Sequence, residues 1–283
     1  MIKPTSLRFG TAGIPKCCNG TTGDGIEEVR KLGLESLELE FVRSINISEK
    51  RAPEIKEASK KHDVVLTSHG QYFINLNAQE PEKLIASYKR IIDASRRAYE
   101  CGAWSICFHF AYYMKQDKDK VHKLVVKRAK EIRKKLDDEG IKIWLRPETT
   151  GKGTQWGDLI ETLKVSEEVE GILPCVDFAH LHARSIGKYN TYDEFRWQLE
   201  QIEKYTGREG LNNMHIHLAG INYGDKGERN HLNLKDSDMN YKDLLKVWKE
   251  FKIKGAVTCE SPNIEKDPLM LRSIMLRFKY SLF

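Results

Sequence analysis

The sequence predicts a single (β/α)8 barrel, the TIM-barrel fold, over residues 1–283. Short apolar runs with the character of β-strands alternate with amphipathic stretches of helical periodicity, and eight such strands can be counted. Strict alternation of strand and helix implies a parallel sheet, and eight repeats are the number that closes such a sheet into a barrel. The length and the 40% of hydrophobic residues suffice for one large core.

The predicted strands are short runs of mainly aliphatic and aromatic residues. They cover residues 7–12, 36–42, 64–69, 104–110, 142–148, 173–178, 214–219 and 255–260. Helical periodicity is clearest at 81–101, where Leu84, Tyr88 and Ile91 lie at three- and four-residue spacing, typical of a helix that packs on a barrel wall. Because no block of Ser, Gly or Pro marks a linker, a single domain is expected.

A second helical segment, residues 117–139, is dense in lysine and arginine. One interpretation is a patch that binds nucleic acid. However, Val121, Val125 and Ile132 belong to an apolar stripe, and acidic residues are interleaved with the basic ones. We therefore interpret the charged side of this segment as the solvated outer face of a helix.

The composition favours a cytoplasmic protein. The net charge of +6 and the pI near 8.8 favour an anionic partner only slightly, because 47 basic residues are offset by 41 acidic ones. The six cysteines form no CxxC pair, which indicates buried free thiols in a reducing compartment. The N-terminus has no apolar signal core, and the apolar runs are far shorter than the roughly 20 residues of a membrane span. We expect a soluble monomer with no membrane contact.

Histidine and acidic residues recur at the ends of the predicted strands. These residues are His69, His109, Glu148, Asp177, His180, His215 and Glu260. They are separated by 40, 39, 29, 3, 35 and 45 residues, so apart from the close pair each gap is about one strand plus one helix. The C-terminal strand ends of a (β/α)8 barrel converge on one mouth, where the active sites of this fold lie. The spacing therefore predicts one site to which many strands contribute.

The residue types at this site predict a metal enzyme. Imidazole combined with carboxylate suits Zn, Mn or Fe, whereas Ca and Mg prefer oxygen ligands alone. Four histidines and three acids exceed the coordination positions of one ion, so two or three ions that share a bridging carboxylate are expected. A lone histidine at a strand end is more often a core residue, but the joint occurrence favours metal binding. His182 and His217, each two residues beyond a candidate, are assigned to supporting or substrate contacts.

Asp177 and His180 are only three residues apart. On a straight strand their side chains would face opposite sides. Both reach one site only if the strand ends near Phe178 and the chain then curls back. We therefore expect this pair at the start of a loop.

Six segments carry a family resemblance: SHGQYFINL (68–76), FHF (108–110), RPETTGKG (146–153), VDFAH (176–180), MHIHLAG (214–220) and CESPN (259–263). In order and spacing they resemble the endonuclease IV family of abasic-site DNA repair nucleases, over almost the whole chain. The resemblance implies a TIM barrel that carries three zinc ions. It also implies that the seven residues above are ligands, with Glu148 bridging two zincs.

The resemblance further implies a function in base excision repair. Such an enzyme hydrolyses the DNA phosphodiester 5′ to an abasic site through a zinc-bridged hydroxide, and its partner is double-stranded DNA. Glu148 and Glu260 would be catalytic as ligands that fix and polarise the nucleophile. Tyr72 and Phe73 fall where the family places side chains that enter the minor groove. Arg43 is what this chain offers where the family has a DNA-penetrating element.

The third zinc site departs from the family pattern. The family has an Asp-x-His element after strand seven, where this chain has Gly-Glu-Arg-Asn-His at 227–231. Glu228 replaces the Asp, Asn230 stands at the His position, and His231 follows one place later. Because loops absorb an offset and imidazole is a better zinc ligand than carboxamide, Glu228 and His231 are the expected ligands. Three zincs are thus expected, two of them on a complete ligand set, with manganese as an alternative metal.

Two other functions compete with the nuclease. A sugar isomerase or epimerase of the xylose-isomerase-like class holds one divalent metal with two Glu, an Asp and a His, and Glu148, Glu260, Asp177 and His215 would fit it. Such an enzyme has no use for His69, His109 and His180 together, and this surplus favours the nuclease. In the other, a non-catalytic barrel that binds nucleic acid or metal, the whole ligand set would have no catalytic role.

Overall fold

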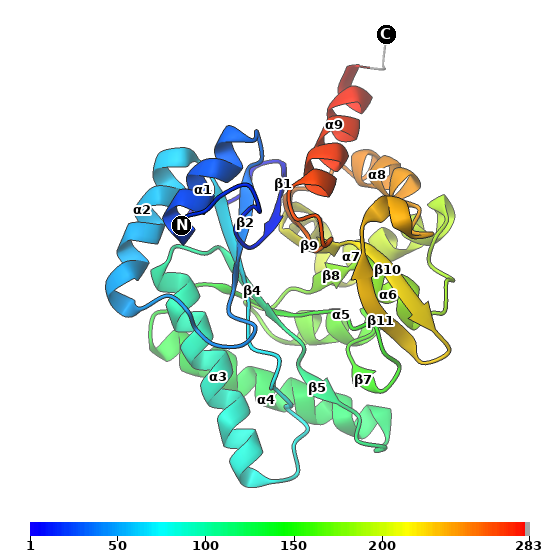
Figure 1. The fold of residues 1–283 in the computed structure, drawn as a ribbon. Coiled ribbons are helices and arrows are strands. Elements are labelled where there is room, and N and C mark those ends of the chain that lie inside the picture. The colour runs from blue at the N-terminus through cyan, green and yellow to red at the C-terminus, as the bar shows by residue number, and fades with distance from the viewer. Residues whose placement is uncertain (281–283) are drawn as a thin grey trace.

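A computed structural model describes residues 1–280. Its centre is an eight-stranded parallel sheet in the order β6-β4-β3-β2-β1-β12-β9-β8 (Figure 1). The strands are β1 (Leu7–Ala12), β2 (Ser36–Glu40), β3 (Val65–His69), β4 (Ser105–Phe108), β6 (Trp144–Pro147), β8 (Cys175–Asp177), β9 (Met214–Leu218) and β12 (Gly255–Cys259). The predicted TIM barrel of eight parallel strands is confirmed.

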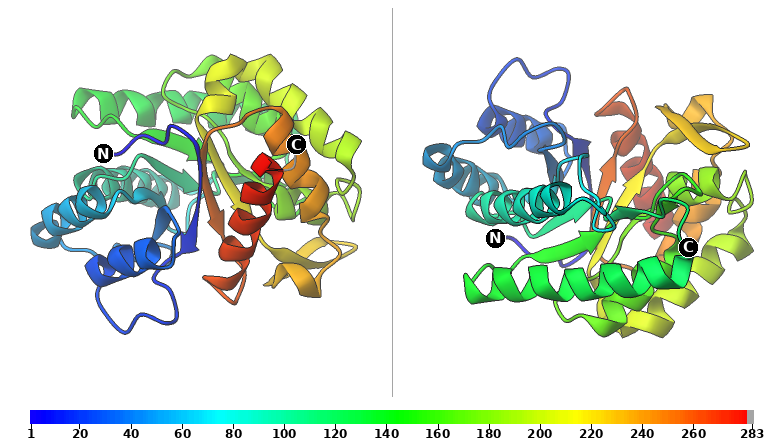
Figure 2. Two further views of the ribbon diagram at one scale, coloured as in Figure 1. Left: turned by 90° about the horizontal axis from the view of Figure 1, so that it is seen from above. Right: turned by 90° about the horizontal axis from the view of Figure 1, so that it is seen from below.

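Helices follow the strands along the chain and lie outside the sheet (Figure 2). They are α1 (Thr22–Lys31), α2 (Ala52–His62), α3 (Pro81–Glu100), α4 (Lys118–Asp138), α5 (Leu159–Glu168), α6 (Phe178–Arg184), α7 (Tyr192–Asn212), α8 (Tyr241–Glu250) and α9 (Lys266–Tyr280). The charged helix α4 buries Val121, Val125 and Ile132 and exposes most of its lysines, as its apolar stripe predicts.

Short elements decorate the loops that follow the strands. Two are 3-10 turns, η1 (Glu49–Arg51) and η2 (Leu234–Asp236). Two are antiparallel pairs, β5 (Ala111–Tyr112) with β7 (Gln155–Trp156) and β10 (Gly220–Gly224) with β11 (Gly227–Leu232). The β10–β11 hairpin extends away from the barrel in Figure 1 and carries Glu228 and His231.

The barrel is nearly closed, and its weakest seam lies between β6 and β8. These strands are joined by two isolated bridges, Leu145 with Ile172 and Glu148 with Cys175. Leu145 N donates to Gly171 O over 3.2 Å, and Thr149 N donates to Cys175 O over 3.0 Å. Every other neighbouring pair in the barrel shares a regular ladder.

The interior of the barrel is polar, although branched aliphatic residues dominate most TIM barrels. Alternate residues of a strand face the same side, so Ser105, Cys107 and His109 face inward along and just beyond β4 while Ile106 packs in the hydrophobic core outside. Along β9, His215 and His217 face inward in the same way. Charged and thiol groups therefore fill the barrel beneath its mouth.

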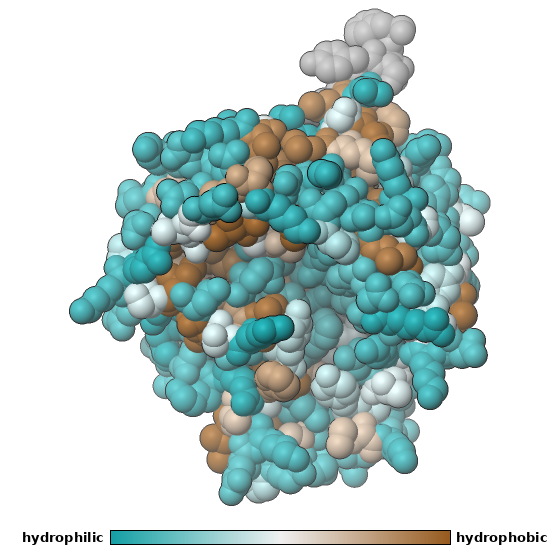
Figure 3. Space-filling view, viewed as in Figure 1, coloured by the Kyte–Doolittle hydropathy of each residue, from teal (hydrophilic) through white to brown (hydrophobic). Residues whose placement is uncertain are grey.

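Apart from β1, the barrel strands are shorter than predicted, and several predicted C-terminal residues belong to the loops that form the mouth. Among the described residues, no helix combines the length and apolarity that crossing a membrane requires. Hydrophilic side chains cover most of the face shown in Figure 3. Four of the six cysteines are buried and all are free thiols.

Candidate metal centre

Glu148, directly after β6, lies at the centre of the barrel mouth and is 1% exposed. Its Oε2 is 3.1 Å from His69 Nε2 and 3.3 Å from His109 Nε2. Its Oε1 is 3.4 Å from His180 Nδ1 and 3.2 Å from His217 Nδ1. One carboxylate therefore contacts four imidazoles, which come from four different strand ends.

Asp177 and His180 reach this group because the chain turns sharply between them. β8 ends at Asp177, close to the strand end that their three-residue spacing predicted, but the helix α6 begins at Phe178 where a loop was expected. Asp177 caps the helix, since its Oδ1 accepts a hydrogen bond from His180 N over 2.8 Å. Its other oxygen, Oδ2, lies 3.2 Å from His180 Nδ1.

Glu260, after β12, completes a second side of the group. Its Oε1 is 3.5 Å from His217 Nδ1, and its Oε2 is 3.9 Å from His231 Nδ1. The ligand atoms of Glu148, Asp177, His217 and Glu260 all lie within 4.8 Å of one another. These four residues form a compact ligand set of three carboxylates and one imidazole.

The β10–β11 hairpin brings Glu228 and His231 to the same region. Glu228 Oε2 lies 3.5 Å from His180 Nε2, and His231 Nε2 lies 3.4 Å from the same nitrogen. Residues three apart on a regular strand face opposite sides. Here the pairing shifts between Asn222 with Asn230 and Tyr223 with Glu228, so Arg229 is a bulged residue and both side chains turn to one face.

Gly151 allows the hairpin to approach so closely. A Cβ at this position would lie 2.5 Å from Glu228 Oε2 and 3.1 Å from His180 Cδ2. The Gly151 carbonyl also accepts a hydrogen bond from Glu228 N over 3.0 Å. The hairpin is thereby fixed against the loop that follows Glu148.

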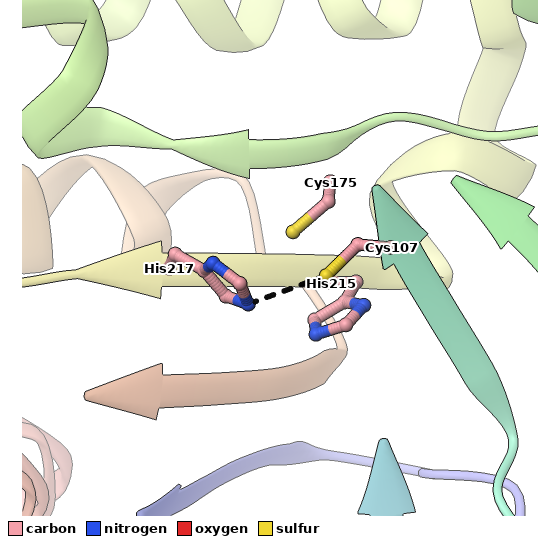
Figure 4. Close-up of side chains that lie close together, drawn as sticks. All are labelled: Cys107, Cys175, His215 and His217. Carbon is pink, nitrogen blue, oxygen red and sulfur yellow. Dashed lines mark hydrogen bonds between the residues drawn. The ribbon is translucent and has the colours of Figure 1, made fainter. Parts of the chain in front are cut away.

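His215 lies apart from the residues predicted to join it. Its Nε2 is 2.8 Å from Glu38 Oε2 and its Nδ1 is 3.0 Å from Ser105 Oγ, one layer below Glu148. Figure 4 shows His215 and His217 together with the thiols of Cys107 and Cys175, inside the barrel. Of the two β9 histidines, His217 is the one that contacts Glu148. The sequence assigned the ligand role to His215 and a supporting role to His217; in the structure His217 lies beside Glu148, and His215 lies one layer below it.

A comparison with known protein families finds a match to the family described as xylose isomerase-like TIM barrel over residues 26–277. The chain belongs to this family. A relative in Methanocaldococcus jannaschii, an uncharacterized protein, is 42% identical over 271 residues, which cover 96% of this chain and 97% of that protein. A probable endonuclease 4 of Chlorobium limicola is 27% identical over 168 residues, 57% of this chain and 56% of that protein.

Solved structures of two kinds share this xylose isomerase-like barrel. Endonuclease IV from Thermus thermophilus has a TM-score of 0.72 and 16% identity, over 96% of this chain and 99% of that one. A D-tagatose 3-epimerase-like protein has a TM-score of 0.71 and 18% identity, over 96% and 97%. These similarities show the fold alone.

Two buried carboxylates near the site, both on β2, were missed by the sequence analysis. Glu38 and Glu40 alternate with leucines in the run Ser-Leu-Glu-Leu-Glu, so both face the barrel interior. Glu38 is fully buried beneath His217, and Glu40 has a buried Oε1 without a hydrogen-bond partner. Two charged residues at period two inside an apolar strand were the signal that could have revealed them.

Electrostatics within the site are dominated by burial and by contacts between carboxylates and imidazoles. Burial alone would raise the pKa of the Glu148 carboxyl, but positive charge on His109, His217 and His69 outweighs it and holds that pKa well below its ordinary value. Burial and the neighbouring charge of Glu38 raise the pKa of Glu40 to about 8. Burial lowers the pKa of His215 to about 4, so this imidazole is neutral at pH 7.

The donor set fits divalent transition metals. Glu148 Oε2, Asp177 Oδ2 and His109 Nε2 are buried and have no hydrogen-bond partner in the described part of the chain. Buried polar atoms that face one another without partners are unfavourable unless something lies between them. Imidazole nitrogens and carboxylate oxygens in this mixture suit Zn or Mn. The residues of this site can thus hold metal ions, and Glu148 belongs to more than one ligand group.

Tyr72, Phe73 and Arg43 lie on loops that follow β3 and β2. The Tyr72 ring contacts the His69 ring edge-on, with centroids 5.6 Å apart. Tyr72 is 51% exposed and Phe73 is 71% exposed. The Phe73 carbonyl accepts a hydrogen bond from Arg90 over 2.8 Å, which fixes the loop. Arg43 is exposed.

Proposed function

We propose that this chain is a zinc- or manganese-dependent endonuclease that hydrolyses duplex DNA on the 5′ side of abasic sites, in base excision repair. The observation that carries the proposal is the sharing of ligands between adjoining groups. His109, Glu148 and His180 form one group, and Asp177, His180 and His231 form another. The set around Glu260 adds a third, which again contains Glu148.

The number of ligands supports a polynuclear centre. His69 and His109 would bind the first ion with Glu148, while Asp177, His217 and Glu260 would bind the second with the same carboxylate. His180, Glu228 and His231 would bind the third. Nine residues at one mouth exceed what a single ion can use, and phosphodiester hydrolysis is a reaction for which clusters of two or more metals are suited.

Bound zinc or manganese would supply Lewis acidity that polarises a phosphodiester and acidifies water. Glu148 and Glu260 are the proposed catalytic residues, because their carboxylates would hold the ions and orient the bound water and phosphodiester. His217 and His231 flank Glu260 and restrain its two oxygens. The chemistry requires no side-chain nucleophile.

The rim of the mouth suits a macromolecule. Tyr72 and Phe73 expose large aromatic surfaces beside His69, and such side chains can wedge between bases and displace a damaged nucleotide from the stack. Arg43 would contact the phosphate backbone. The similarity to the probable endonuclease 4 of Chlorobium limicola supports the same assignment.

A single-metal sugar epimerase is the second candidate. The compact set of Glu148, Asp177, His217 and Glu260 would suffice for one divalent ion, and epimerase structures share the fold. This candidate uses His217 in place of His215. It leaves the groups around His109 and His231 without a role.

A cleavage assay tests the proposal. A duplex oligonucleotide with one abasic analogue is incubated with the protein, with and without a chelator, beside an undamaged duplex. We expect a cut at the 5′ side of the lesion, its loss with chelator and its recovery with added zinc or manganese. An intact abasic strand together with metal-dependent epimerisation of ketohexoses would replace the nuclease by the epimerase.

A further inference from the structure

Glu38 lies beneath the metal centre and contacts both histidines of β9. Its Oε2 accepts a hydrogen bond from His215 Nε2 over 2.8 Å. Its Oε1 lies 2.9 Å from His217 Nε2, within ion-pair distance, but this pair lacks the alignment of a hydrogen bond. All three side chains are fully buried. Glu38 therefore connects His217 with the layer below it, and the Cys107 thiol is a second neighbour of His217 Nε2, at 3.8 Å.

The layer below consists of Ser105 and Arg146. Ser105 Oγ lies 3.0 Å from His215 Nδ1 and accepts a hydrogen bond from Arg146 Nε. The guanidinium also donates to Pro174 O over 2.9 Å and to Asn213 O over 2.7 Å, and it stacks near the Trp104 ring. Arg146 is thus fixed at the base of the barrel.

The direction of each hydrogen bond follows from the chemistry of Arg146. A guanidinium can only donate, so Ser105 Oγ accepts from it and has its own hydrogen left for His215 Nδ1. His215 Nδ1 is then an acceptor, so the proton of this ring lies on Nε2 and points to Glu38. Glu38 has one oxygen remaining, which faces His217 Nε2.

The arrangement also balances charge. In the described part of the chain, no carboxylate lies within ion-pair distance of Arg146, so this buried cation has only neutral partners. Glu38 is the carboxylate to which its hydrogen-bond chain leads. A buried charge is tolerated only where other groups compensate it. Arg146 and Glu38 compensate each other through Ser105 and His215.

We propose that Glu38 is a positioning residue for the metal centre: held by His215, Ser105 and Arg146, it keeps the proton of His217 on Nε2 and presents Nδ1 as the ligand atom. His217 Nδ1 is the nitrogen that faces Glu148 and Glu260, at 3.2 and 3.5 Å. This inference rests on the proposed metal centre and assigns a role to two residues outside it, Glu38 and His215. Partners of this kind orient ligands and raise metal affinity.

The test is a Co2+ titration of metal-depleted protein, followed by the visible absorption of the bound ion. Variants Glu38→Gln and Ser105→Ala interrupt the chain at two points. Thr67→Val is the matched control: Thr67 is buried, pairs with Glu38 in the strand register, and its hydroxyl has no hydrogen-bond partner. Urea unfolding of each metal-depleted variant monitors the fold separately.

We expect Glu38→Gln to weaken one class of Co2+ site by about 10- to 100-fold and to change its absorption band, while the other sites keep their affinity. Ser105→Ala should weaken the same class to a smaller extent, and Thr67→Val should bind as the parent does. If Glu38→Gln does not fold, Ser105→Ala decides by the same criterion.

Parental affinity in both chain variants would overturn the positioning role and leave the metal centre in place. A uniform loss at all sites, or an equal loss in Thr67→Val, would overturn it as well, because the effect would then come from the packing of the barrel interior. Failure of the parent protein itself to bind Co2+ would refute the proposed function instead.

Discussion

At the scale of single residues, Glu148 concentrates four imidazole contacts on one buried carboxylate. The contacts depend on its negative charge, because neutral carboxamide oxygen is a weaker ligand and its NH2 group cannot face a ligand nitrogen. Glutamine has nearly the same shape as glutamate, so the change Glu148→Gln tests the effect of the charge separately from the effect of packing.

Glu148→Gln should lower cleavage of abasic DNA by at least about a hundredfold, in the range for loss of one strong transition-state contact. Cleavage rates under single-turnover conditions measure this, and elemental analysis should show fewer metal ions per chain. The same exchange at Glu167, an exposed residue of α5, is the control and should leave both quantities unchanged. Near-normal cleavage by Glu148→Gln would exclude this carboxylate from the centre.

The sequence indicated that the strand with His215 and His217 supplies a histidine to the site, but not which of the two. Both face inward because they are two residues apart, so periodicity cannot separate them. Their difference is depth: His217 is one layer nearer the mouth, and depth depends on the stagger of β9 against its neighbours. Glu38 and Glu40 were missed although their period-two spacing places both on one face of the strand, because that spacing does not show which groups they contact.

At the scale of elements, the β10–β11 hairpin shows how a one-residue offset is absorbed. Arg229 bulges out of the ladder, and Glu228 and His231 turn toward His180. Asn230 instead bonds with its Nδ2 to His231 O and is exposed. The sequence suggested that the loop would take up the offset, but the bulge itself depends on the pairing with β10 and could not be read from β11 alone.

His231→Ala should lower metal content and cleavage substantially, because it removes an imidazole from the group with Asp177 and His180. Asn230→Ala, the neighbouring change, should have a small effect on both. Elemental analysis and the abasic cleavage assay measure the two variants side by side. If Asn230→Ala lost more metal and activity than His231→Ala, the third site would have to be assigned to the Asn230 amide, or the mechanism would use two metals.

The strand–helix alternation was predictable because each element carries its own periodicity, and all eight barrel strands lie where apolar runs predicted them. Strand ends were not predictable to the residue. β8 stops at Asp177 because that side chain caps α6, and the apolar Phe178 that seemed to continue the strand is the first helical residue. Local hydrophobicity does not distinguish these two conformations.

At the scale of the whole molecule, the barrel encloses an unusual number of buried charged groups. Their mutual arrangement replaces part of the aliphatic packing that fills most barrels. Ions that bind the folded chain and not the unfolded one would therefore stabilise the fold as well as serve the reaction.

Chelation should accordingly lower the free energy of unfolding, and zinc should restore it. When the free zinc concentration is 100 times the dissociation constant of a site, binding stabilises the fold by about 2.7 kcal/mol. The shift in the urea midpoint should therefore be large. Urea titrations with chelator and with a series of free zinc concentrations measure this dependence. A midpoint that is independent of zinc would contradict metal binding in the barrel.

The seam between β6 and β8 has a consequence for the motions of the protein. Amide hydrogen exchange reports local opening, and the least protected amides of a sheet lie where pairing is sparse. Leu145 and Thr149, whose amides cross this seam, should exchange faster than the amides of β9 and β12. Glu148 and Asp177 lie on opposite sides of the same seam, so an ion held between them would link β6 to β8. Zinc should then slow amide exchange at the seam more than elsewhere. The metal centre would in this way complete the barrel wall where hydrogen bonds between strands are fewest.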